Sequence, residues 1–581
     1  MRLTSRVVAL AIVGLLAPVV GAQETAKHGV QADQRIPEDT YLYFSMPSVN
    51  VMKARWGQAH GAKMYEDPAF DGIKEEIMNA FGEQFEEMKT EMSENLGMTP
   101  MELLQIPSGQ VSLAVSALDD ELGFIMFVDF GDSRRAVDGL MKKAAEGMAQ
   151  DGIEMTTEDF SGTEISVFAL PGMDNNPFAR ALHYCIRDTE LVISTSMPLM
   201  KNALSNWDGS DSETFVANEK WSYVKERCGS GNKHASINWF VDPIGMFNAV
   251  ANTGAVPQAA FGQAMLPSFG LDKLDGMGGT VDMAVGKFDA ISKMVYLCKD
   301  PSGVLKVFTL KETDMTPPSW VPSAVAMYSG MNWDVAGAYT AVEGLVDSWS
   351  GEGGLAQQID QMANDGPGIH IKDDIIDQLT GKIQMIGAAG EASEAPAGAA
   401  GGAAALLSSN MAIALGCKDE GAMKALLTKL TETGGFPGEV REFRDTTLIE
   451  IPNPGGQTMG LGVTRGNLMI STDITLIEQL IRGSDDPLTG SDAYKRVAAE
   501  FPSQAMGLSF ADPKSSYKSM YESFRDGDPG EMFPGMGEVL ENIDFKKLPP
   551  FEAVAKYLLP TGSFTVSDDR GAFSQSFTLK P

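Results

Sequence analysis

The sequence predicts an α+β protein built from two tandem copies of a largely antiparallel sheet unit with helices packed on it. Short motifs recur in the same order: Ile-Ser-Thr stands at 193–195 and 470–472, and Phe-Thr-Leu-Lys at 308–311 and 577–580. A long internal period of this kind indicates one domain of about 270 residues written twice. Within each copy, apolar runs joined by short turns predict more hairpins than crossovers, which is typical of an antiparallel sheet covered by helices on one face.

The elements follow one another in the same order in both copies. Each copy begins with a strand, continues through a helical region, a hairpin and a helix, and then has two more hairpins before a further helix. Apolar residues at steps of three and four predict a helix over 70–96. In the first copy we expect strands at 40–44, 111–115, 124–130, 181–186 and 191–194, and we expect closing strands at 304–310 and 573–579.

Helix starts are marked by matched polar residues. An apolar strand ends at Phe240 or Phe510, and Asp242-Pro243 or Asp512-Pro513 follows. Aspartate is a good N-cap because its carboxylate accepts an unpaired backbone N–H, and proline in the first turn has no N–H to lose. Ser196 and Asp473 hold equivalent positions after the recurring Ile-Ser-Thr, so we expect caps there as well.

The domain boundaries follow from the repeat. We place repeat unit one at 36–311 and repeat unit two at 321–581. Residues 312–320 contain Pro317 and Pro318, which predict a stiff, extended linker. The Gly/Ala-rich stretch at 390–409 cannot bury much surface, so we expect a disordered loop there.

The N-terminus predicts export. Arg2 and Arg6 precede an apolar run of about 14 residues, and small residues before Gln23 suit signal peptidase. Residues 1–22 are therefore expected to be a signal peptide and 23–35 a disordered N-terminus. The run is shorter than the roughly 20 residues that a membrane span needs. We expect an exported protein, periplasmic or at the cell surface, soluble after signal cleavage and without a membrane span in the mature chain.

The charge of the chain excludes one class of partner. Forty-five basic residues stand against 78 acidic ones, a formal net charge of −33. Loss of Arg2 and Arg6 with the signal peptide takes this to −35. A field of this sign repels nucleic acid and anionic lipid and favours solubility, so we expect no nucleic-acid partner.

The cysteines and histidines form no ligand motif. Four cysteines allow three disulfide connectivities, of which Cys185–Cys228 is the best placed, and buried free thiols are the alternative. Neither Cys-x-x-Cys nor His-Glu-x-x-His occurs, and the glycines near 276–279 lack a strand–loop–helix context. We therefore expect no metal site and no cofactor-binding site. The other two cysteines are Cys298 and Cys417, and the five histidines are His28, His60, His183, His234 and His370.

The candidate catalytic residues all have a structural explanation. Asp242 and Asp512 recur at strand ends, where helix capping accounts for them. Ser194 and Ser471 lack the Gly-x-Ser-x-Gly pattern of a nucleophile elbow, so we expect their hydroxyls to bond locally. The sequence thus predicts no catalytic residues and no enzyme activity.

The whole chain resembles a bacterial family of exported proteins that carry a domain of unknown function, often in two tandem copies. The resemblance rests on Pro37 entering the first strand, Asp67-Pro68 opening the helical region, and Asp242-Pro243 later in the chain. It implies the duplicated α+β fold and export, and it implies no activity or catalytic residues.

Three functions stay open from the sequence. The first is a non-catalytic binding or envelope-associated protein, whose partner is an unknown protein or envelope component bound at a sheet edge or in the groove between the units. The second is a hydrolase with a site in that groove, beside 312–320. The third is a scaffold that associates with itself, which large exposed apolar patches would favour.

Overall fold

The computed structural model describes residues 29–119, 121–171, 176, 178–229, 236–366, 368–388, 410–432, 438–452, 458–526 and 543–581. The fold is α+β, as the sequence predicted, with antiparallel strand pairs and helices packed on them. The chain divides into two compact units. Unit 1 runs to Pro267 and takes in Leu274–Cys298, and unit 2 comprises Ser268–Lys273 and the chain from Lys299 onward.

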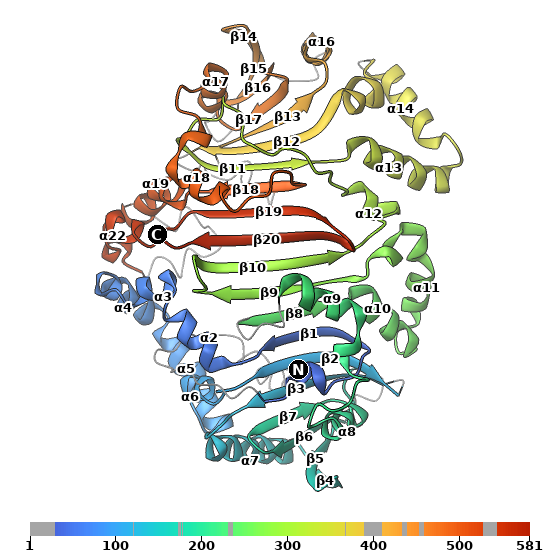
Figure 1. Cartoon of the computed structure of the whole chain (residues 1–581), viewed down its shortest axis with the longest axis vertical. Coiled ribbons are helices and arrows are strands. Elements are labelled where there is room, and N and C mark those ends of the chain that lie inside the picture. The colour runs from blue at the N-terminus through green and yellow to red at the C-terminus, as the bar shows by residue number, and fades with distance from the viewer. Residues whose placement is uncertain are drawn as a thin grey trace. The chain divides into compact units, whose positions relative to one another are not determined.

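Among its described residues, unit 1 contains ten strands in the order β4-β5-β6-β7-β3-β2-β1-β8-β9-β10, and each neighbouring pair is antiparallel (Figure 1). The order follows from hairpins between consecutive strands, with β3 pairing β7 and β1 pairing β8. The strands are β1 Thr40–Met46, β2 Val111–Leu118, β3 Glu121–Asp129, β4 Met155–Phe160, β5 Thr163–Ala169, β6 Ala181–Arg187, β7 Glu190–Ser194, β8 Ile237–Val241, β9 Gly276–Met283 and β10 Phe288–Leu297.

The described part of unit 2 contains ten strands in the order β14-β15-β16-β17-β13-β12-β11-β18-β19-β20, which is the strand order of unit 1. All neighbours are again antiparallel. The strands are β11 Val325–Asn332, β12 Leu379–Ala388, β13 Met411–Cys417, β14 Glu439–Phe443, β15 Thr446–Pro452, β16 Thr458–Thr464, β17 Asn467–Ser471, β18 Gly507–Ala511, β19 Thr561–Asp568 and β20 Gly571–Leu579.

The helices also fall at corresponding places in the two units. A helical region follows the first strand, one helix precedes β4 or β14, and two flank the loop before β8 or β18. In unit 1 the helices are α2 Val49–Trp56, α3 His60–Glu66, α4 Asp71–Ala80, α5 Gly82–Leu96, α6 Pro100–Gln105, α7 Arg134–Gln150, α8 Met197–Ser205, α9 Glu219–Cys228, α10 Pro243–Asn252 and α11 Pro257–Met265. In unit 2 they are α12 Gly303–Val307, α13 Val335–Ser350, α14 Gly354–Asp365, α16 Glu420–Glu432, α17 Ile474–Arg482, α18 Asp492–Ala498, α19 Pro513–Asp526 and α22 Phe551–Ala555.

Residues matched in the sequence hold matched register positions. Tyr43 lies opposite Phe240 across β1 and β8, and Tyr328 lies opposite Phe510 across β11 and β18. All four side chains are at most 3% exposed. An aromatic side chain from α9 or α18, Trp221 or Tyr494, packs against the phenylalanine. The two cores are thus built alike, and the duplication that would account for this remains our prediction.

The predicted strand at 304–310 is wrong. The chain forms the short helix α12 there, and Phe308 is 72% exposed. Gly303 takes a φ of 52°, a left-handed conformation that glycine adopts readily and that starts a turn instead of a strand. The strand that closes unit 1 is β10, which pairs β9 as β20 pairs β19. Fully buried Val295 therefore holds the place of Phe577, and the repeated Phe-Thr-Leu-Lys is a coincidence.

The predicted boundary between the units is also corrected. Residues 299–311 group with unit 2 and not with unit 1. Residues 312–320 pack against unit 2: Thr313 pairs with Ala505, and Met315 and Trp320 are 2% and 7% exposed. The Pro318 carbonyl accepts the Val321 N–H at 3.0 Å in a turn, and the apolar side chains of this stretch are buried, so it is a covering segment and not a linker.

The N-terminal prediction fails in the part that the structure describes. Ala32–Gln34 forms a 3₁₀ turn, and Arg35 is 3% exposed because its guanidinium pairs with Glu190 at 2.8 Å. Residues 29–35 are therefore ordered by a buried ion pair. The expected signal peptide, residues 23–28 and the expected loop at 390–409 lie outside the described residues.

The apolar stripe predicted over 70–96 is divided between two helices. The chain breaks at Phe81, between α4 and α5. Ile73 is buried, whereas Ile77, Phe81 and Phe85 are 42%, 39% and 37% exposed. Among the described residues, no helix is long and apolar enough to cross a membrane.

Candidate functional site

The matched serines and threonines close a strand-to-helix corner in each unit. The Ser194 hydroxyl donates to the carbonyls of Phe124 and Ser196, at 3.0 and 2.9 Å, and accepts the Ser196 N–H. Thr195 exchanges two hydrogen bonds with Phe124, one through its Oγ1 and one through its N–H, both at 3.0 Å. These hydroxyls have local partners, as the sequence predicted.

Unit 2 repeats this corner bond for bond. The Ser471 hydroxyl donates to the carbonyls of Met411 and Asp473, and Thr472 exchanges the same two bonds with Met411. A network that is conserved between the units and satisfied within each is explained by chain geometry alone.

The matched aspartates cap helices. Asp242 accepts the Gly245 N–H at 2.7 Å, and Asp512 accepts the Lys514 N–H at 3.1 Å. Asp473 likewise accepts the Thr475 N–H at 2.7 Å. Each bond satisfies an amide that the first turn of a helix leaves unpaired.

Three histidines lie within the described residues, and each bonds within its own unit. His60 contacts Asp289 at 2.8 Å, where α3 meets β10. His370 contacts Asp360 at 3.0 Å. His183 is 5% exposed and lies 3.1 Å from the Ser194 carbonyl, and desolvation lowers its pKa. The register position of His183 is held by Gly460 in unit 2, so His183 has no histidine counterpart there.

All four cysteines are buried as thiols outside any disulfide, so the pairing Cys185–Cys228 is not formed. The Cys185 thiol contacts the Met200 sulfur at 3.5 Å, and burial raises its pKa to about 12. A thiol with a raised pKa is protonated at neutral pH and is therefore a poor nucleophile. No group of three or more His, Cys, Asp or Glu side chains among the described residues is arranged to hold a metal ion. Gly276, Gly278 and Gly279 lie in β9.

An exposed edge strand occurs at the same place in both units. Strand β4 pairs only with β5 among the described strands, and β14 only with β15. Five of the six residues of β4 are exposed, and Met155 and Val440 expose 47% and 55% of their surface. An edge of this kind offers unpaired N–H and C=O groups to another strand.

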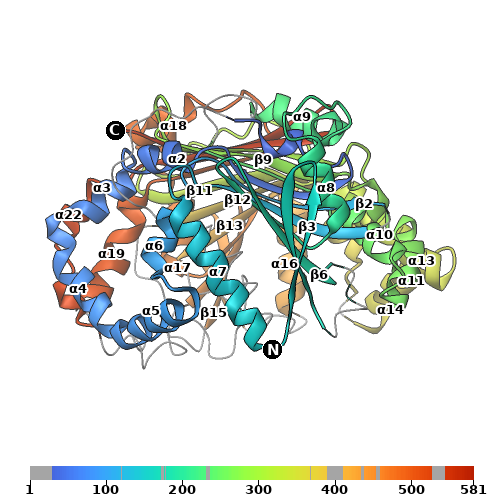
Figure 2. The same ribbon diagram turned by 90° about the horizontal axis from the view of Figure 1, so that it is seen from below.

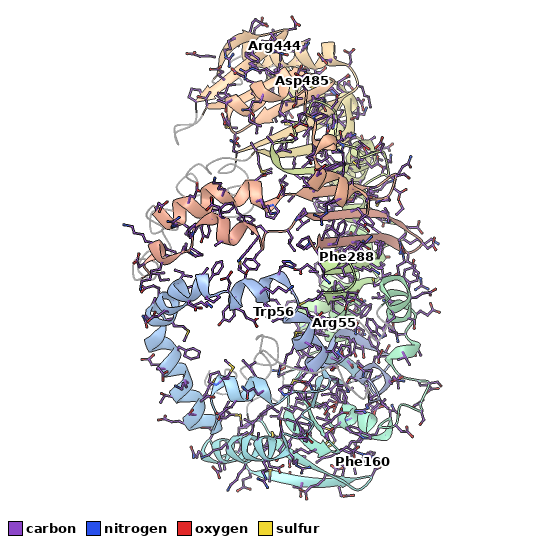
Figure 3. The ribbon with its side chains drawn as sticks, turned by 60° about the vertical axis from the view of Figure 1, so that its left-hand side comes forward. Arg55, Trp56, Phe160, Phe288, Arg444 and Asp485 are labelled. Carbon is purple, nitrogen blue, oxygen red and sulfur yellow. The ribbon has the colours of Figure 1, made fainter. Side chains whose placement is uncertain are left out.

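The outward groups can be assigned from the hairpin geometry. Residue pairs alternate along an antiparallel ladder, and the pair flanking a two-residue turn is hydrogen-bonded. Phe160–Thr163 and Phe443–Thr446 flank such turns, so the main-chain groups of Thr157 and Asp159 point outward in unit 1. The equivalent positions in unit 2 are Val440 and Glu442. Phe160 and Arg444, labelled in Figure 3, mark the two hairpin tips.

An ion pair holds each edge hairpin to the helix behind it. In unit 1, Lys201 of α8 pairs with Glu158 of β4 at 2.6 Å and lies over the Phe160 ring at 5.7 Å. In unit 2, Glu478 of α17 pairs with Arg441 of β14. Glu158 and Arg441 hold equivalent register positions, opposite Ile165 and Leu448, and Lys201 and Glu478 are each the fifth residue of their helix.

The polarity of this contact is therefore reversed between the units while the contact itself is kept. The ring at the hairpin tip also keeps its cation: the guanidinium groups of Arg441 and Arg482 lie 5.4 and 5.0 Å from Phe443. We call Lys201–Glu158 and Glu478–Arg441 the two clamps. The clamps could not be found by aligning the two copies. A Lys–Glu pair and a Glu–Arg pair have different residues at both equivalent positions, so no repeated residue marks them.

Comparisons with known proteins add little. No family model matches the chain, and no curated protein matches it. One solved structure is found, titled "Structure of crystal form I of TP0453", at 9% sequence identity and a TM-score of 0.24; it covers 48% of this chain and 82% of the other.

Proposed function

We propose that the protein is an exported, non-catalytic binding protein whose partner adds an extended segment to the edge strands β4 and β14. The observation that carries the proposal is the recurrence of an exposed, clamped edge strand at one position in both units. Strand addition to a sheet edge takes its affinity from main-chain hydrogen bonds and its specificity from alternate side chains.

The charge of the edges indicates which kind of segment binds. Asp159 and Glu442 occupy equivalent outward positions, and Glu154 and Glu439 lie nearby. Like charges directly opposite each other destabilise a strand pair, and opposite charges stabilise it. These carboxylates therefore disfavour pairing between two copies of the same edge and favour a partner strand that carries lysine or arginine.

The clamps suit this role. A strand with five exposed residues buries little surface of its own, so it needs another contact to remain in place. Each clamp binds the side chain of Glu158 or Arg441, whose main-chain groups pair with the neighbouring strand. It therefore leaves the outward main-chain groups of the edge strand available to a partner. The edge is thus fixed before a partner arrives, which lowers the ordering cost of binding.

The test uses a six-residue peptide of alternating lysine and valine, titrated against the mature protein by calorimetry, with a glutamate–valine peptide as the charge control. We expect the basic peptide to bind and the acidic one not to. Thr157→Pro with Val440→Pro removes one outward N–H from each edge and should abolish binding. Thr157→Ala with Val440→Ala keeps both N–H groups and should retain it.

Two results would contradict the proposal: equal binding of both peptides, or binding that survives both proline substitutions. The alternative from the sequence, a hydrolase, predicts a different outcome. It requires turnover of an ester, phosphate, peptide or glycoside substrate that one substitution abolishes without unfolding the chain. The edge-strand variants leave such turnover unaffected.

A further inference from the structure

Unit 1 contains a pocket that the edge strands do not involve. The pocket has a volume of about 660 Å³ and lies between the end of α5, helix α6 and one face of α7. These three helices lie near one another in Figure 2. The volume is within the range of small-molecule sites.

Local sequence explains why the space is open. Helix α5 ends at Gly97, whose φ of 73° turns the chain, and Thr99 starts α6 with a capping box that includes Glu102. On α7, Val137, Leu140 and Met141 face the core. The opposite face presents Ala136 and Gly139 to the pocket, and an added Cβ at Gly139 would meet no atom within 4 Å.

The pocket is apolar on one side and charged on the other. Leu96, Met98 and Ile106 belong to the α5–α6 side, and Arg135, Lys142 and Lys143 come from α7. Two carboxylates, Glu102 and Glu146, also line the space. The lining therefore carries a net charge of +1, three cations against two carboxylates, in a chain whose net charge is −33.

Both carboxylates are already engaged. One Glu102 oxygen accepts the N–H and the hydroxyl of Thr99, at 2.8 and 2.9 Å, and these bonds lower the pKa of Glu102. Glu146 lies 3.5 Å from Lys143 and 3.9 Å from Lys142. The methylene chain of Lys143 lies beside Gly97, because a Cβ added to Gly97 would be 3.3 Å from the Lys143 Cγ.

Arg135 is the cation left for a ligand. Within the described part of the chain its guanidinium forms no ion pair, whereas the adjacent Arg134 pairs with Asp138 at 2.9 Å. Arg135 also lies in the first turn of α7, where Ser133 makes no side-chain cap bond and the helix dipole favours negative charge. A guanidinium binds carboxylate, sulfonate or phosphate oxygens in a fixed forked geometry.

We infer that this pocket binds a small organic anion with an apolar body, whose acidic group meets Arg135 and whose body lies on Leu96, Met98 and Ile106. The site is independent of the edge strands. It needs no catalytic group, because every titratable side chain of the lining has a binding or packing role.

The first test compares two probes that differ by one sulfonate group, 8-anilinonaphthalene-1-sulfonate and its uncharged analogue N-phenyl-1-naphthylamine, in fluorescence titrations of the mature protein. We expect the sulfonate to bind more tightly. Arg135→Gln should weaken sulfonate binding about tenfold, the usual effect of losing a charge-assisted hydrogen bond. Arg134→Gln, the matched control, should change it by less than about twofold.

The second test fills the pocket. Gly139→Leu places a side chain in the open space and should abolish sulfonate binding, while Gly147→Leu on the same helix, outside the pocket and equally free of neighbours, should not. Both substitutions replace a glycine within a helix, so the fold should be kept or stabilised. Sulfonate binding that is unchanged by both Gly139→Leu and Arg135→Gln would overturn the inference, and so would equal affinity for the two probes.

Discussion

The two units share one strand order but provide the first residue of β7 and of β17 with polar partners of different chemistry. In unit 1 the contact is ionic: Arg35 pairs with Glu190 at 2.8 Å, and Gln110 donates to the same carboxylate at 3.3 Å. Unit 2 has Asn467 at the position of Glu190, each being the first residue of its strand. The Gln384 amide donates to Asn467 at 3.3 Å, and no charge is buried at that position.

The fold therefore needs a satisfied polar contact at this position and does not need a charge. The reversed clamps teach the same lesson at the surface, since Lys201–Glu158 and Glu478–Arg441 hold equivalent elements together with opposite polarity. The two units keep the same geometry but hold it with side chains of different chemistry. A residue shared by both units is therefore first a candidate for a structural role.

The largest expected effect is the loss of a buried charge partner in unit 1. Arg35→Met leaves Glu190 buried and unpaired, which should lower the free energy of unfolding by about 3–5 kcal/mol. Asn467→Ala in unit 2 removes a neutral partner and should lower it by about 1–3 kcal/mol. Urea unfolding of the whole chain measures the loss of stability in both variants. Equal losses would mean that the ionic contact of unit 1 is no stronger than the neutral contact of unit 2.

The matched helix caps should differ by less. Asp512→Ala removes one cap bond and should lower stability by about 1 kcal/mol. Asp242 is buried and also pairs with Lys220 at 2.6 Å, so Asp242→Ala should lower it by about 2 kcal/mol. Asp→Asn at both positions keeps the cap, and only the unit 1 variant should then lose stability. A larger effect for Asp512 than for Asp242 would contradict this account.

The clamps can be tested by exchanging their charges. Lys201→Glu places two carboxylates together and should destabilise the β4–β5 hairpin by less than about 1 kcal/mol, and adding Glu158→Lys should restore it with the polarity of unit 2. The readout is amide hydrogen exchange at the β4–β5 hairpin in each variant. If the double variant is no more stable than the single one, the reversed contact is not an equivalent clamp.

The smallest expected effect is on how stability depends on pH. Burial lowers the pKa of His183, so the unfolded chain, with an ordinary histidine pKa near 6.5, takes up a proton first as the pH falls. Stability from neutral His183 is thus present above pH 6.5 and lost below it, down to the lowered pKa of the folded state. His183→Gln should flatten this part of the pH profile. Amide hydrogen exchange in β16 of unit 2, where Gly460 holds the position of His183, should be the same in the original chain and in His183→Gln.

Much of the fold could be predicted from the sequence because its signals are local. Alternation predicted the hairpins, and Asp-Pro predicted the caps on α10 and α19. The closing strand of unit 1 was predicted at the wrong place because residues 308–311 are identical to 577–580. The left-handed backbone of Gly303, which starts a helical turn there, is not visible in that match. The covering role of 312–320 and the burial of Arg35 depend on residues distant in sequence, so local patterns carry no trace of them.

The candidate sites were less predictable than the fold. The edge strands follow from strand order, and strand order depends on which distant strands pair. The clamps required the register of β4 and β14, since reversed charges do not align as a repeat. The pocket depends on small residues on one face of α7, and Gly139 in isolation resembles any helix glycine.

The most direct test of the central claim is amide hydrogen exchange on the mature protein, with and without the lysine–valine peptide. We expect slower exchange at the outward amides of Thr157 and Asp159 in β4 and of Val440 and Glu442 in β14. Protection should be absent with the glutamate–valine peptide. Protection by the basic peptide that appears elsewhere and leaves both edge strands unchanged would contradict the proposal that these edges are the binding site.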